Sequence, residues 1–70
     1  MAEEQDELAA AESNINSARQ IVERQKQLIA NLQKAGSDTR VALQNLEMYE
    51  TSLRIYEGHR DYLKSRGDKH

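Results

Sequence analysis

Apolar residues recur every seven positions along the first half of the chain. When each heptad is lettered a to g and Leu8 is placed at a, two mostly apolar rows appear. The a row is Leu8, Ile15, Val22 and Ile29, and the d row is Ala11, Ala18, Gln25 and Leu32. Four unbroken heptads favour a left-handed coiled coil over an irregular globular helix. They predict a helix from about residue 4 to residue 35.

The same heptad frame fits the second half of the chain. With the lettering restarted after the turn, the a row is Leu46, Leu53 and then Arg60, and the d row is Ala42, Tyr49, Tyr56 and Leu63. This pattern predicts a second helix over about residues 39–66. Gly67 is a candidate C-terminal cap, and residues 67–70 are expected to form a frayed tail. Gly58 falls inside this helix at an outward position, where glycine costs up to about 1 kcal/mol relative to alanine.

The segment Gly36-Ser37-Asp38-Thr39 interrupts the helical pattern near the midpoint. Gly36 can adopt the left-handed conformation that ends a helix, and Ser37 or Asp38 can cap the start of the next one. A connection this short folds two helices back as antiparallel neighbours. The sequence therefore predicts an all-α fold. It is a single domain over residues 1–70, an antiparallel hairpin of two long coiled-coil-like helices with a turn at residues 36–38.

Antiparallel pairing also predicts which residues face each other. The expected hairpin seam consists of Ile15, Ala18, Val22, Gln25, Ile29, Leu32, Leu46, Tyr49, Leu53, Tyr56 and Leu63. Small residues face large ones in most d layers, and Gln25 faces Tyr49 as a possible hydrogen-bond partner. Along one edge, the e positions place three pairs of opposite charge across the hairpin. These are Lys26 with Glu50, Arg19 with Glu57, and Glu12 with Lys64. Such pairs disfavour slipped registers.

A second apolar stripe follows the other edge of the hairpin. Its members are Ile21 and Leu28 at g positions of the first helix, and Val41, Met48, Ile55 and Tyr62 at c positions of the second. Two helices alone cannot bury this stripe, and a contiguous exposed apolar patch usually marks an interface. The sequence therefore predicts that these six residues form the interface of a homodimer, in which two hairpins make a four-helix bundle.

The composition of the chain indicates its source of stability and its cellular location. Seventy residues bury little apolar surface, so a partner chain is a common source of stability at this size. The chain has no cysteine, 31% of its residues are charged, and its net charge is −2, which is typical of a solvated helical surface. No apolar run approaches the roughly 18 residues of a membrane span, and the acidic start does not resemble a signal peptide. These features predict a cytoplasmic protein without a membrane partner.

Few residues are candidates for catalysis, metal binding or nucleic-acid binding. His59 lacks a second histidine one turn away, and the arginines of the second helix alternate with carboxylates, so neither a metal site nor a nucleic-acid surface is expected. The three tyrosines fit seam and interface packing better than a stacking ladder for bases. No phosphate-binding loop, nucleophile elbow or zinc motif is present. We therefore expect no catalytic residue, no cofactor and no enzymatic activity.

Several short motifs resemble a known group of proteins. They are Arg24-Gln25, Leu28-Ile29-Ala30-Asn31-Leu32, Gly36-Ser37-Asp38-Thr39, Ala42, Leu46 and His59-Arg60-Asp61-Tyr62-Leu63. In this spacing they resemble small helical proteins of rhizobia and related alphaproteobacteria, a group without an assigned activity. Ser37 stands where that group usually has histidine. The resemblance implies a bacterial source, and roles in register, capping and a polar network for Gln25, Asp38 and His59-Arg60-Asp61.

Two functional hypotheses follow from these patterns. The first is a self-associating hairpin that acts as an interaction or scaffold module. The alternative is a regulatory binder whose apolar stripe docks on a helix of a signalling or transcription protein. A binder of that kind is expected to be poorly ordered alone and to gain helix with its partner.

Overall fold

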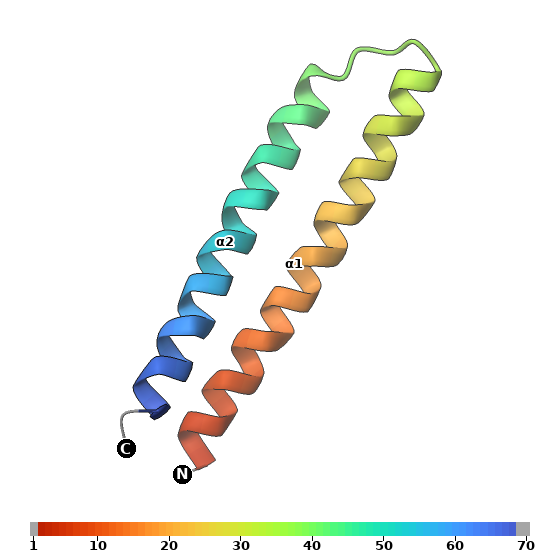
Figure 1. The fold of residues 1–70 in the computed structure, drawn as a ribbon. Coiled ribbons are helices and arrows are strands. Elements are labelled where there is room, and N and C mark those ends of the chain that lie inside the picture. The colour runs from red at the N-terminus through yellow and green to blue at the C-terminus, as the bar shows by residue number, and fades with distance from the viewer. Residues whose placement is uncertain (1, 69–70) are drawn as a thin grey trace.

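Two helices lie side by side and run in opposite directions (Figure 1). The computed structural model describes the fold of residues 2–68 and the side chains of residues 6–67. Helix α1 spans Ala2–Lys34 and helix α2 spans Arg40–Asp68. The Cα positions extend over 55 × 15 × 12 Å. The predicted all-α antiparallel hairpin is confirmed.

The helix ends differ from the expected ones by one or two residues. Helix α1 begins at Ala2 and ends at Lys34, and α2 begins at Arg40. The cap expected at Gly67 is wrong, because α2 continues through this residue to Asp68. Gly36 is the only described glycine with a positive φ, so Gly67 does not adopt the left-handed conformation that ends a helix. Of the expected tail, residues 69 and 70 lie outside the described part of the chain.

The turn ends α1 by a Schellman motif. Gly36 has a φ of 71°, and its N–H donates to the Gln33 carbonyl at 3.1 Å. The Ser37 N–H donates to the Leu32 carbonyl at 2.9 Å. These are the two bonds that satisfy the last carbonyls of a helix that closes on a left-handed glycine.

Asp38 caps the N-terminal end of α2. Its Oδ1 accepts a hydrogen bond from the Arg40 backbone N–H at 2.9 Å, so Asp38 rather than Ser37 supplies the side-chain cap. The Thr39 carbonyl then accepts from the Leu43 N–H at 2.8 Å, which closes the first helical turn. The chain therefore reverses direction with its exposed amides and carbonyls largely paired.

The core is a single line of side chains between the helices. The buried residues are Ala11, Ile15, Ala18, Val22 and Ile29 of α1, and Ala42 and Leu63 of α2. The other expected seam residues are Gln25, Leu32, Leu46, Tyr49 and Leu53, which are half-buried, and Tyr56, which is 40% exposed. The small and β-branched residues of α1 are covered by the larger residues of α2. Those larger residues extend past their neighbours, so α2 is the less completely buried helix.

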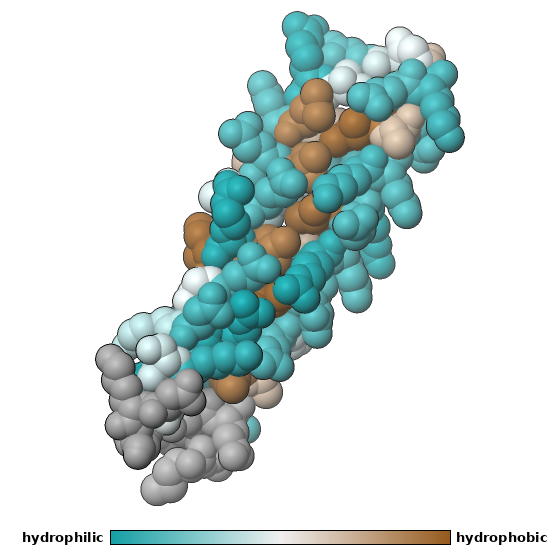
Figure 2. Space-filling model, viewed as in Figure 1, coloured by the Kyte–Doolittle hydropathy of each residue, from teal (hydrophilic) through white to brown (hydrophobic). Residues whose placement is uncertain are grey.

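Figure 2 shows this line from one side. Apolar side chains form a narrow strip between the helices, with hydrophilic side chains on both margins. Across the hairpin, the predicted pair of Arg19 and Glu57 is present, with Nη2 and Oε2 at 3.4 Å. This contact agrees with the register that the seam rows predict.

Three other predicted contacts are wrong. Lys26 pairs with Glu23, one turn away on its own helix, at 3.9 Å instead of reaching Glu50. Among the described side chains, Glu12 and Lys64 form no ion pair. Gln25 donates its Nε2 hydrogen to the Ala42 carbonyl at 2.8 Å and not to Tyr49. The short Ala42 side chain leaves its carbonyl oxygen accessible, so the amide reaches backbone rather than phenol.

Candidate interaction surface

The six residues expected at an interface all have exposed side chains. We call them the apolar flank: Ile21 and Leu28 are 43% and 46% exposed, and Val41, Met48, Ile55 and Tyr62 are 68%, 61%, 65% and 60% exposed. They lie on one side of the hairpin because α2 presents its c positions there and α1 its g positions. Nothing in the hairpin itself covers them, so this side presents large apolar groups to water.

Charged side chains avoid this side of the molecule. From residue 10 to residue 62, the c and g positions of both helices include a single formally charged residue, Arg24. The b and e positions on the opposite side carry many charges over the same span. Their charged residues are Glu12, Arg19, Glu23, Lys26, Arg40, Glu47, Glu50, Arg54, Glu57 and Asp61. Depletion of charge around large apolar and aromatic residues distinguishes the centre of protein interfaces from ordinary surface.

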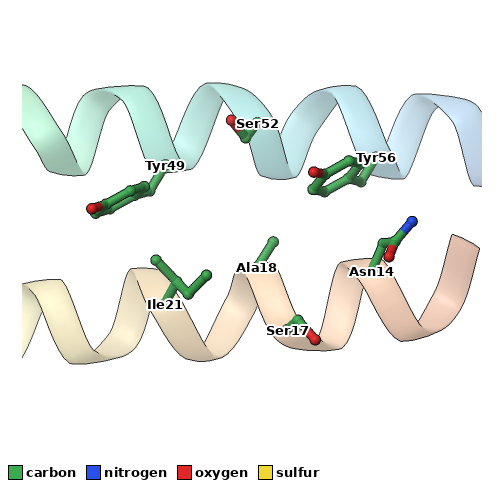
Figure 3. Close-up of a pocket in the computed structure, with 7 residues that line it drawn as sticks. All are labelled: Asn14, Ser17, Ala18, Ile21, Tyr49, Ser52 and Tyr56. Atoms are coloured by element: carbon green, nitrogen blue, oxygen red, sulfur yellow. The ribbon is translucent and has the colours of Figure 1, made fainter.

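A groove of about 200 Å³ opens within this side (Figure 3). Its lining residues are Asn14, Ser17, Ala18, Ile21, Tyr49, Ser52 and Tyr56. The rings of Tyr49 and Tyr56 extend from α2 toward α1, and Ala18 points up between them. Small side chains at Ser17, Ala18 and Ser52 leave the space that these two rings border. We call this groove, which is open to solvent, the socket.

A second hollow, of about 330 Å³, lies on the same side near the free ends of the helices. Asn14 of α1 and His59 of α2 both border it. Arg66 crosses from α2 to α1 and pairs with Glu7 at 2.7 Å, and its guanidinium lies 5.8 Å from the centre of the Tyr62 ring. These contacts close the end of the hairpin with a polar cluster.

The other polar and charged side chains that the structure describes do not gather into a site. Within residues 2–68, no group of three or more histidine, cysteine, aspartate or glutamate side chains is placed to hold a metal ion. In the His59-Arg60-Asp61 segment, the Arg60 guanidinium pairs with Asp61 on the same helix at 2.9 Å. Across that same described range, neither helix combines the length and apolar character needed to cross a bilayer.

Sequence reasoning missed two features. Leu43 is 46% exposed on the charged side, in the same row as Glu50 and Glu57. Its e position identifies it as an edge residue, and its isolation from other apolar residues sets it apart from the apolar flank. The Arg66–Glu7 pair was also missed, although the two residues continue the g rows that contain Asn14 and His59.

Comparison with protein-family models, curated proteins and solved structures finds no match.

Proposed function

We propose that this protein is a non-enzymatic interaction module, and that it works by pairing two hairpins into a four-helix bundle through the apolar flank. The observation that carries the proposal is the exposure of six large residues on a side nearly free of charge. A second copy offers the same surface in return, which is what a two-fold interface requires.

The incomplete burial of α2 supports the same proposal. Only two of its described residues are buried, Ala42 and Leu63, and Leu46, Tyr49 and Leu53 keep part of their surface in water. A bundle of four helices surrounds such residues on more sides than a hairpin can. Pairing therefore adds to the core as well as covering the apolar flank.

The test is the mass of the particle in solution, measured by sedimentation equilibrium. We expect the unmodified chain to sediment with twice the mass of one chain. Ile55→Lys places an ammonium in the centre of the apolar flank and is expected to give a monomer with reduced helicity. Leu43→Lys is the matched control, because it makes the same change at an exposed leucine of α2 on the opposite side. It is expected to leave the dimer intact.

A monomer of the unmodified chain would contradict the proposal, whether it is helical or not. A poorly helical monomer would in addition favour docking on a different helical protein. Equal dissociation by the two lysine variants would also contradict the proposal, because it would place the interface elsewhere.

A further inference from the structure

The proposed pairing leaves open how the second hairpin is oriented. Resting on that proposed function, we infer that the second copy packs with its turn at the same end, related by a two-fold axis parallel to the helices. Helix α1 of each copy then lies against α2 of the other. Three observations favour this arrangement: the alternation of large and small residues, the charges at the free ends, and the length of the surface.

In this arrangement, the two-fold symmetry allows only one alignment of the two hairpins along their length. A two-fold axis along the hairpin brings residues of equal height together, with no sliding allowed. Within each hairpin, the contacts of Arg19 with Glu57 and of Arg66 with Glu7 show which residues lie at equal height. The facing residues of the two copies can therefore be named from one copy.

At most heights, a large apolar residue then faces a smaller one. At the g positions, Ile21 of one copy faces Ser52 of the other, and Leu28 faces Asn45. In the c rows, Tyr62 faces Ala10, Ile55 faces Ser17 and Val41 faces Asn31, whereas Met48 faces the long side chain of Arg24. This alternation lets two surfaces interdigitate at the density of a protein interior. It also places Ile21 beside the socket that Tyr49, Ser52 and Tyr56 border in the second copy.

Charge complementarity favours the same orientation. Glu7 and Arg66 form an ion pair at the end of each hairpin opposite the turn. With both turns at one end, the two pairs meet and their charges alternate around the bundle. In a dimer of opposite orientation with full overlap, Glu7 instead lies against Leu28 and Arg66 against Asn45. Glu7 keeps its Arg66 partner within the hairpin in either orientation, but only the arrangement with both turns together adds a second opposite charge beside it. Against a leucine, the carboxylate loses solvation without this further gain.

The length of the surface disfavours an opposed dimer that is shifted along the helix axis. An opposed dimer can match Ile21 with Leu28 only by shifting along the axis, and that shift leaves Tyr62 outside the overlap. One side of a rod 55 Å long and 15 Å wide presents on the order of 800 Å², which is about what each partner of a stable complex buries. A shifted dimer falls short of this area, whereas the arrangement with both turns together uses all of it.

A single spin label tests the orientation. The chain contains no cysteine, so Ser37→Cys provides one labelling site in the turn, at an exposed side chain. Double electron–electron resonance then measures the distance between the two labels of a dimer. We expect a single distance below about 30 Å, since packed helices lie about 10 Å apart. Opposed turns give a distance comparable with the 55 Å length of the hairpin.

The outcomes separate the two proposals. A dimer with the long distance, or with both distances, overturns the orientation and leaves the proposed pairing in place. A monomer in sedimentation overturns the pairing itself. Mixing labelled with excess unlabelled Ser37→Cys protein is the control, because it must abolish a signal that arises between two chains.

Discussion

Gly58 is a residue that the hairpin does not require. A Cβ built onto it meets no atom within 4 Å, and its φ is not positive, so alanine fits its place in α2. Glycine costs a helix interior about 0.5–1 kcal/mol because it loses more backbone freedom on folding. We expect Gly58→Ala to raise the free energy of unfolding by that amount. Urea denaturation followed by circular dichroism, at one fixed protein concentration, measures it.

Gly36 provides the matched control, because the same substitution there has the opposite sign. Its φ of 71° is a conformation that costs a residue with a Cβ about 1–2 kcal/mol. Gly36→Ala is therefore expected to destabilise the hairpin. If Gly58→Ala also destabilised it, the bare backbone at Gly58 would be in contact with another chain.

At the scale of the elements, the segment Gly36-Ser37-Asp38-Thr39 predicted the turn, and the heptad pattern was sufficient for the two helices and their register. It assigns each residue to a row, and the rows determine which residues face each other. It does not determine where a long side chain ends. Gln25 and Lys26 have several rotatable bonds each, and both found partners other than the predicted ones. The row of Tyr56 was predicted, but its ring is too large to be covered opposite Ala18.

The turn between the elements gives the chain a pH-dependent contribution to stability. The guanidinium and the backbone N–H of Arg40 bind the Asp38 carboxylate, and they lower the pKa of Asp38 from its ordinary value. The folded state therefore favours the charged carboxylate more than the unfolded chain does. The contribution is complete above the unfolded pKa of about 3.9 and is lost as the pH falls through the lower, folded pKa.

Two variants of Asp38 separate its charge from its cap. Asp38→Ala is expected to lower the melting temperature at pH 7, and its difference from the unmodified chain is expected to shrink toward pH 2. Asp38→Asn retains a capping oxygen but no charge, so its loss at pH 7 is expected to be smaller. Thermal melts of the three chains across this range measure both effects. A constant difference between Asp38→Ala and the unmodified chain would show that the Arg40 contact does not contribute.

At the scale of the whole molecule, the hairpin is long and only one layer of helices thick. In a hairpin 55 Å long, one line of buried side chains runs from Ala11 to Ile29 of α1 and from Ala42 to Leu63 of α2. Each helix has most of its circumference in water. A second layer of helices is the ordinary way to complete such a core. If that layer is a second copy, folding and association are one equilibrium, and stability depends on the concentration of the chain.

This linkage predicts a melting temperature that rises with protein concentration. For a dimer that unfolds to two separate chains, each tenfold dilution lowers the apparent free energy of unfolding by about 1.4 kcal/mol. Melts followed by circular dichroism over two decades of concentration measure this shift. The Leu43→Lys control is expected to show the same slope, because its substitution lies outside the apolar flank. The Ile55→Lys variant is expected to show none, since a monomer unfolds without a change in the number of particles. A concentration-independent melt of the unmodified chain would mean that the single layer of buried residues between α1 and α2 is stable without another chain.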